Sequence, residues 1–83
     1  MIKLNGEMRG NMPRKIRQLK ADLRKAGAYQ VSQEGSHTKW KHQSLPGSTV
    51  IISGHDGDDA KLYQEKAVRE FLRQIAERKW STQ

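Results

Sequence analysis

The chain has no cysteine and only three histidines among its 83 residues. The absence of cysteine excludes disulfides, thiolate metal sites and a thiol nucleophile. No apolar run approaches the roughly 18–20 residues of a membrane-spanning helix, and no signal-peptide core is present. The hydrophobic fraction is low, at 34%, but the apolar residues recur with clear periodicity. We therefore expect one small cytoplasmic domain with a thin core.

Positive charge is concentrated in the first part of the chain. Residues 1–49 hold ten Lys and Arg against three Asp and Glu, whereas residues 50–83 hold six of each. The first range therefore carries the whole net charge of +7. A basic surface of this kind suits a polyanion such as nucleic acid, or else an acidic protein. The plainest alternative is a solvated basic surface without a specific partner.

Hydrophobic periodicity indicates two helices separated by three short strands. In chain order, the expected helix, three strands and helix lie at residues 12–26, 29–33, 37–42, 49–53 and 60–79. They form a single domain over residues 12–79. A flexible arm at residues 1–11 is expected before it and a tail at residues 80–83 after it.

Each expected helix has one apolar stripe. In the first helix, apolar residues recur every three or four positions, at Ile16, Leu19, Leu23 and Ala26. In the second, the stripe consists of Ala67, Val68, Phe71, Leu72, Ile75 and Ala76. Two such helices bury their stripes by packing on one face of an antiparallel sheet. The expected fold class is therefore α+β, in the order α-β-β-β-α, with the other sheet face open.

Other signals concern the outer strands and the loop before the second helix. Tyr29 and Val31 share one face of the first strand, which is expected to be half buried. The third strand has β-branched residues at all of positions 50–52, so its facing stays open. In the Gly- and Asp-rich loop that follows, Asp58 or Asp59 is expected to cap the second helix.

The second strand, HTKWKH, carries the residues of greatest chemical interest. Because side chains alternate along a strand, His37, Lys39 and Lys41 share one face. Trp40, the large apolar residue, shares the other face with His42 and should point to the helices. An imidazole and two ammonium groups are therefore expected on the open face, unless a bulge at the Gly-Ser turn rotates His37 by one position.

An imidazole beside two ammonium groups suits the cleavage of RNA. RNA supplies its own nucleophile, the 2′-OH, and an enzyme must remove its proton, protonate the leaving 5′-oxygen and stabilise the charge on phosphorus. Histidine ordinarily titrates near pH 6.5 and can do either proton transfer. Such a group typically contributes roughly 10²–10⁴-fold to the rate. Lysines offset the charge on phosphorus, and no step requires a metal.

Plainer interpretations of these residues remain open. A lone histidine after a Gly-Ser turn is more often an ordinary turn or strand residue than a catalyst. No second histidine or buried acid is placed to make Ser36 a nucleophile. A metal site is not expected, because His37 and His42 lie on opposite faces of the strand and the acidic cluster at residues 56–59 lies in a flexible loop.

In combination these features resemble the HicA family of bacterial toxins, from HicA–HicB toxin–antitoxin systems. The resemblance runs from about residue 12 to residue 76. A basic helix ending in LRKAGAY is followed by the stretch QEGSHTKW at residues 33–40, then by His42 and a Pro-Gly turn. A β-branched strand, His55 and a final amphipathic helix complete the pattern.

The resemblance implies a fold like that of double-stranded-RNA-binding domains, and an mRNA interferase that cleaves mRNA without a metal or other cofactor. It implies that His37, in the GSH motif, is the essential catalytic residue and that a HicB-type antitoxin covers the active surface. We further expect Lys39 and Lys41 to hold phosphate, and Gly35 and Ser36 to form a tight turn that offers an N–H to phosphate. The RNA track would continue along three basic residues of the first helix: Arg14, Lys15 and Arg17.

Two other functions compete with a toxin ribonuclease. A non-catalytic module that binds duplex RNA is the first, but such modules need a basic start to the second helix to grip phosphates. Here Asp56, Asp58 and Asp59 precede that helix and would repel phosphate. The second is a protein-binding adaptor whose basic face meets an acidic partner, which an antitoxin would also satisfy.

Overall fold

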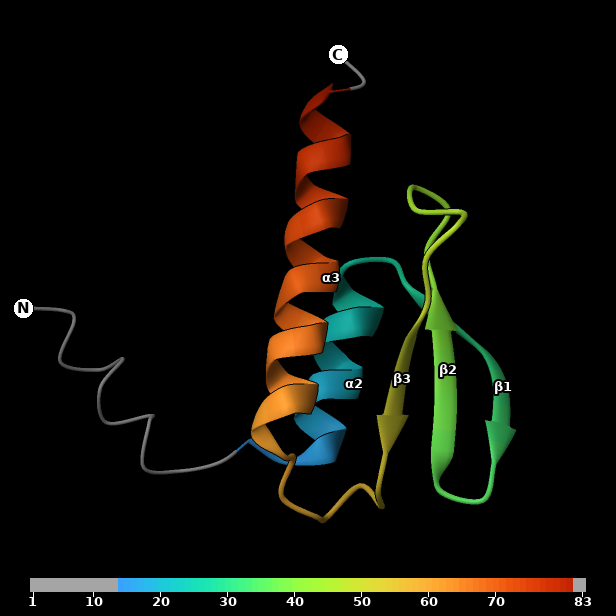
Figure 1. The fold of residues 1–83 in the computed structure, drawn as a ribbon, viewed down its shortest axis with the longest axis vertical. Coiled ribbons are helices and arrows are strands. Elements are labelled where there is room, and N and C mark those ends of the chain that lie inside the picture. Colours follow the sequence, from blue (N-terminus) through green and yellow to red (C-terminus); the bar gives the residue numbers. More distant parts are fainter. Residues whose placement is uncertain (1–13, 82–83) are drawn as a thin grey trace, which may run out of the picture.

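The computed structural model describes residues 14–81, which form a helix, three strands and a second helix (Figure 1). These elements are α2 (Ile16–Lys25), β1 (Tyr29–Glu34), β2 (His37–Lys41), β3 (Val50–Ser53) and α3 (Leu62–Ser81). The expected arm at residues 1–11 lies outside the described residues, as do residues 82–83 of the expected tail. The expected α+β class and the order of the elements are confirmed.

The strands form one antiparallel sheet in the order β1-β2-β3, so each strand pairs with its neighbour in the chain. Both helices lie on the same side of this sheet (Figure 1). The side chains of the middle strand alternate between buried and exposed along most of its length. We call the sheet face that no helix covers the open face.

The core lies between the helices and the inner face of the sheet. The largest fully buried side chains are Trp40, Ile16, Leu19, Leu23 and Ile52. From α3 the core receives Val68, Phe71 and Ile75. Trp40 is only 1% exposed, which confirms that it points to the helices. Truncating a buried ring of this size to alanine typically costs about 3–5 kcal/mol.

The apolar faces of α3 and β3 are clearer in the structure than in the sequence. Ala67 and Ala76, expected in the apolar stripe of α3, are exposed. The buried stripe of this helix is therefore narrower than the sequence predicted. In β3, Val50 and Ile52 face the core. Ile51 points the other way and is 50% exposed. The facing of β3, which three consecutive β-branched residues left open, is thus decided by its pairing with β2.

β1 is exposed along its whole length, so the expectation of a half-buried strand is wrong. Tyr29 is 49% exposed and Val31 is 43% exposed. The physical reason is that the helices pack on the part of the sheet nearer β3 and leave β1 as an uncovered edge. The register also shifts between Gln30 and Ser32, which marks a β-bulge with Val31 as the extra residue.

The first helix begins at Ile16, later than the expected residue 12, because the loop before α3 meets its first turn. The N–H of Ile16 donates to the carbonyl of Asp58 at 2.9 Å, and that of Arg17 donates to the carbonyl of Asp56 at 3.1 Å. These bonds satisfy N–H groups that have no partner inside a helix. The loop is therefore attached to α2, contrary to the expectation that it is flexible.

The carboxylates of this loop do not cap α3, which corrects another expectation. Asp58 Oδ2 accepts a hydrogen bond from the N–H of His55 at 3.0 Å. Asp59 Oδ1 accepts one from Lys15 Nζ at 2.6 Å. Both acidic side chains therefore stabilise the loop and its contact with the start of α2.

His42 joins the end of β2 to the end of α2. Its ring is 6% exposed, with Nε2 2.9 Å from the carbonyl oxygen of Ala26. Nδ1 accepts a hydrogen bond from the N–H of Ser44 at 2.9 Å. Gly27 stops the helix with a φ of +93°, and a Cβ added there would lie 3.1 Å from His42 Nε2. His42 is therefore a structural residue on the covered side of the sheet.

We expect Gly27→Ala to lower the free energy of unfolding by about 1–3 kcal/mol. Alanine is strained at the positive φ of this position, and its Cβ would lie too close to the ring of His42. Urea denaturation followed by circular dichroism measures the change. Gly57→Ala is the matched control, since its Cβ would enter open space and its φ is not positive. Equal stability of the Gly27→Ala variant and the parent would contradict this description of the junction.

Candidate functional site

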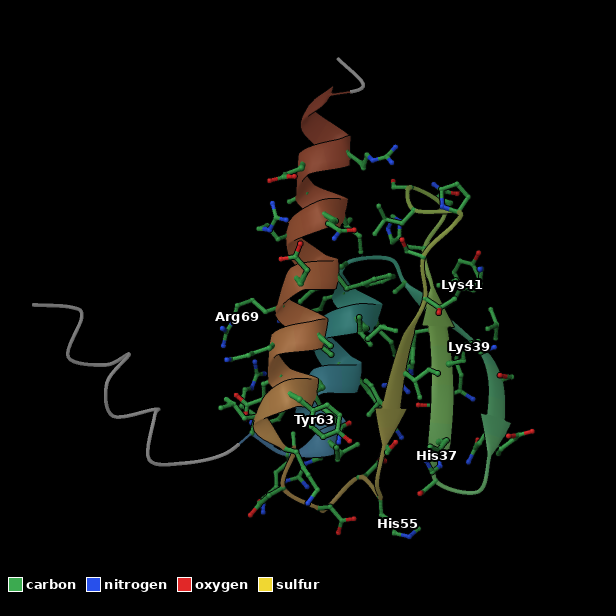
Figure 2. All side chains as sticks on the ribbon, viewed as in Figure 1. His37, Lys39, Lys41, His55, Tyr63 and Arg69 are labelled. Atoms are coloured by element: carbon green, nitrogen blue, oxygen red, sulfur yellow. The ribbon has the colours of Figure 1, made fainter. Side chains whose placement is uncertain are left out.

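The open face of β2 carries a row of three polar side chains (Figure 2). His37 and Lys39 are exposed, and Lys41 is half buried. Thr38 and Trp40 alternate with them and are buried on the inner face. Successive members of the row are two residues apart, which corresponds to about 6.6–6.8 Å along a strand. The structure thus places the imidazole and both ammonium groups on one side of the sheet, as the alternation predicted.

His37 begins β2 directly after the tight turn at Gly35 and Ser36. Gly35 has a φ of +59°, whereas Ser36 does not have a positive φ, a combination that fits a type II′ hairpin turn. A bulge at this turn, which would have rotated His37 by one position, is not present; the bulge of β1 lies at Val31. The imidazole of His37 has no hydrogen bond or ion pair to any other described residue, so it is available to a ligand.

Glu34 is a site residue that the sequence reasoning missed. It lies directly opposite His37 in the register of β1 and β2, and therefore on the same face. It is exposed. A carboxylate there reduces the positive charge at this end of the row, while Lys39 and Lys41 lie farther along. The two-residue turn would have indicated this pairing, because it makes its flanking residues partners.

The end of β3 is fastened opposite His37 by a side chain of α3. Ser53 is the register partner of His37 in β3. Gln64 accepts a hydrogen bond from the N–H of Ser53 at 3.0 Å and donates one to its carbonyl at 3.2 Å. The next N–H, that of Gly54, donates to the carbonyl of Ser36 at 3.2 Å. The Gly-Ser turn, the start of β2 and the end of β3 are therefore held together.

The two lysines of the row differ in their surroundings. Lys41 Nζ lies 3.5 Å from the carbonyl oxygen of Pro46, in the loop between β2 and β3. Lys39 has no hydrogen bond or ion pair within the described part of the chain. Lys39 is also one step nearer to His37 along the strand. It is therefore the ammonium group better placed to meet a phosphate beside the imidazole.

His55 is a second exposed imidazole at the His37 end of the sheet (Figure 2). It follows Ser53, the partner of His37, by two residues. The sequence reasoning gave His55 no role of its own. Its position could be read only once the register of β3 against β2 was known.

The basic residues at and before the start of α2 lie on the helix side of the sheet and are partly neutralised. Arg14 forms an ion pair with Asp22 at 2.9 Å, and Lys15 forms one with Asp59 at 2.6 Å. Arg17 is exposed. The structure does not bring these three side chains onto the open face with His37. Their contact with RNA stays a prediction.

Lys20 of α2 pairs with Asp56 of the loop at 2.8 Å. The hydrogen bond from Lys20, and then its charge, hold the pKa of the Asp56 carboxyl below its usual range. The pair is therefore fully charged at neutral pH, and what it contributes to stability is lost only as the pH falls through that lowered pKa. Because the Asp56 side chain is exposed, its effect is small and sensitive to salt.

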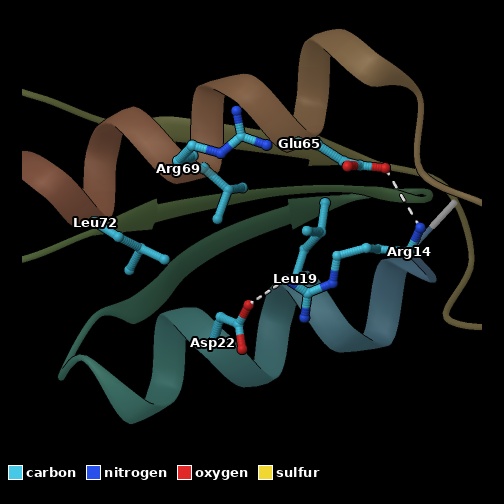
Figure 3. Close-up of a pocket in the computed structure, with 7 residues that line it drawn as sticks. Arg14, Leu19, Asp22, Glu65, Arg69 and Leu72 are labelled. Atoms are coloured by element: carbon cyan, nitrogen blue, oxygen red, sulfur yellow. Dashed lines mark hydrogen bonds and ion pairs between the residues drawn. The ribbon is translucent and has the colours of Figure 1, made fainter. Parts of the chain in front are cut away.

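A shallow hollow between α2 and α3 lies apart from this row (Figure 3). Leu19, Val68 and Leu72 line it with apolar atoms, and the N–H of Arg14 donates to Glu65 Oε2 at 3.3 Å at its rim. No group of three or more His, Asp or Glu side chains suited to a metal ion occurs among the described residues. Neither described helix has the length and hydropathy to span a bilayer.

We expect Gln64→Leu to loosen the site, because it removes both hydrogen bonds to Ser53. The free energy of unfolding should fall by about 1–3 kcal/mol. Hydrogen exchange of the Ser53 amide should become faster. Gln74→Leu, on the same helix, removes only a hydrogen bond to exposed Glu70 and should change stability by less than about 0.5 kcal/mol. An unchanged exchange rate at Ser53 in the Gln64→Leu variant would contradict the fastening role.

A family model described as the HicA toxin of bacterial toxin–antitoxin systems matches residues 16–76. The match begins at the first residue of α2, includes all three strands and ends within α3, so it covers more than half of the chain. Comparison with curated proteins gives no match, and comparison with solved structures gives none either. On the strength of this match, and in agreement with the observed order of elements and the GSH turn ahead of β2, the chain belongs to the HicA family of toxins from bacterial toxin–antitoxin systems.

Proposed function

We propose that this toxin is an endoribonuclease that cleaves mRNA without a metal ion, with His37 as the general acid/base. The observation that carries the proposal is the exposed imidazole of His37, which has no partner among the described residues and shares its sheet face with Lys39. A group that must exchange protons with a substrate needs this access. The match to the HicA toxin family supports the same assignment.

The proposed reaction uses the 2′-OH of the RNA as its nucleophile. His37 accepts the proton of that hydroxyl while the 2′-oxygen bonds to the adjacent phosphorus. The bond from phosphorus to the 5′-oxygen then breaks, and the imidazolium returns the proton to that oxygen. The products are a 2′,3′-cyclic phosphate and a 5′-hydroxyl, and His37 is regenerated. No other reactant is required for this step.

The residues around His37 would hold the phosphate. Lys39 offers an ammonium group that offsets the charge developing on phosphorus, and Lys41 offers a second one farther along the strand. A Cβ added at Gly35 would meet nothing within 4 Å, so a phosphate has room to approach the main chain there. We therefore assign the N–H groups of Gly35 and Ser36 as phosphate donors. Arg14, Lys15 and Arg17, at and before the start of α2, remain proposed as a more distant electrostatic contribution.

As a toxin of a toxin–antitoxin system, the protein has an antitoxin as its partner. We propose that this partner is a HicB-type protein that covers the open face around His37. A net charge of +7 favours an acidic contact surface on it. Such a cover would exclude RNA from the row on β2.

The geometry does not favour binding of duplex RNA instead. Asp56 and Asp59 are paired with lysines, so they repel phosphate less than the sequence suggested. However, the first turn of α3 contains Glu65 and no Lys or Arg. Leu62 and Tyr63 instead present exposed apolar surface there, at 64% and 63% exposure. Single exposed lysines lie before and after this turn, at Lys61 and Lys66, so this helix start has fewer cations than a duplex-binding module typically uses.

We expect His37→Ala to reduce the rate of RNA cleavage in EDTA by about 10²–10⁴-fold. Because His37 is exposed and without a partner in the described chain, stability should change by less than about 0.5 kcal/mol. Cleavage of a mixed-sequence single-stranded RNA, with end-group analysis of the products, is the measurement. His55→Ala removes the other exposed imidazole at this end of the sheet and serves as the control. Undiminished cleavage by the His37→Ala variant would overturn the proposal.

A further inference from the structure

Two large apolar side chains lie on the open face beside the basic row. Tyr29 is 49% exposed and Ile51 is 50% exposed. Tyr29 is the register partner of Lys41, and Ile51 is the register partner of Lys39. Directly opposed residues of an antiparallel pair project from the same face, with neighbouring strands about 4.7–4.9 Å apart. Each lysine therefore has an exposed apolar neighbour.

The bulge in β1 explains why Tyr29 lies on this face together with residues farther along the strand. Gln30 is opposite Trp40 and so lies on the inner side, whereas Ser32 is opposite Lys39 on the open side. Without the extra residue Val31, positions separated by an odd number of residues would face opposite ways. With it, the aromatic ring of Tyr29 and the turn that presents His37 belong to one continuous surface.

We propose that Tyr29 is a base-binding residue, on whose ring an unpaired base of the RNA stacks while the neighbouring phosphates lie along Lys39 and His37. This inference rests on the proposed ribonuclease function and deepens it by naming a residue that binds a base of the substrate. Bases in a duplex are already stacked and paired, so only an unpaired strand can place a base on this ring. Ile51 supplies an apolar contact on the other side of β2.

The distance along β2 between Tyr29's partner Lys41 and His37 indicates which nucleotide stacks on Tyr29. Lys41, the partner of Tyr29, is four residues from His37, which corresponds to about 13 Å along the strand. The base on Tyr29 therefore belongs to a neighbouring nucleotide and not to the one whose 2′-OH reacts. Binding energy from this nucleotide positions the reactive phosphate beside His37.

The composition of the face supports a single strand of RNA as the ligand of Tyr29, whether or not the antitoxin also covers this face. Lys39 and Lys41 lie between Tyr29 and Ile51, so cationic and apolar groups alternate across the three strands. Alternating cationic and aromatic groups match the alternating phosphates and bases of a single strand. Trp40, the other aromatic residue on β2, is buried and cannot take this role.

The test compares Tyr29→Ala, Tyr29→Leu and Tyr29→Phe with the parent on a mixed-sequence 12-nucleotide single-stranded RNA in EDTA. Stacking requires the ring and not the hydroxyl. We expect KM to rise about 5- to 100-fold for Tyr29→Ala and Tyr29→Leu, and to stay within about 2-fold for Tyr29→Phe. The kcat of all three should change by less than about 3-fold. Dissociation constants measured in a His37→Ala background, where the RNA stays intact, should follow the KM values.

Tyr63→Ala is the matched control, because Tyr63 is an exposed tyrosine on α3 instead of the sheet. It should leave KM unchanged. The inference would be overturned if Tyr29→Ala kept the parental KM and dissociation constant. It would also be overturned if Tyr29→Phe raised KM as much as Tyr29→Ala does. Neither outcome would affect His37-dependent cleavage. Loss of antitoxin binding with unchanged RNA binding would also overturn it and assign the face to protein docking. Failure of the parent chain to cleave any RNA would overturn the proposed function itself, a separate outcome.

Discussion

The burial of Trp40 against the two helices decides which side chains of β2 meet solvent. The indole is 1% exposed, and its Nε1 donates a hydrogen bond to Thr38 Oγ1 at 2.9 Å, also on the inner face. The guanidinium of Arg24 lies 5.3 Å from the ring centroid and adds a cation–π contact from α2. A shift of one residue in the register would expel this ring and bury the alternate residues. The same burial that stabilises the core therefore holds His37 and Lys39 on the open face.

The His37 end of the sheet combines local rigidity with access. Gln64 connects α3 to both main-chain groups of Ser53, and the N–H of Gly54 connects β3 to the carbonyl of Ser36. These contacts involve the main chain and leave the imidazole of His37 exposed. A general acid/base needs a fixed backbone and a side chain that can reach the substrate. The fold meets both conditions at one end of one strand.

Tertiary contacts decide which basic side chains are paired with carboxylates and which are not. Lys15, directly before α2, and Lys20 of α2 are paired with Asp59 and Asp56 of the loop before α3. These pairs attach the loop to the helix and reduce the positive potential on that side. The lysines of β2 have no carboxylate partner within the described residues. Two lysines without a carboxylate partner in the described chain are therefore available on the open face, beside the exposed ring of Tyr29.

The sequence by itself determined the order of elements, the stripe of α2 and the alternation of β2, because each depends on residues close together in the chain. The GSH motif and its surroundings also indicated the family. Only the tertiary structure decided the bulge at Val31, the exposure of Tyr29 and the attachment of the acidic loop to α2. These features depend on which strand the helices cover and on contacts between residues far apart in the chain. Such contacts leave no periodic pattern in the local sequence. The facing of His37, Lys39 and Lys41 could thus be predicted, whereas the surface around them required the fold.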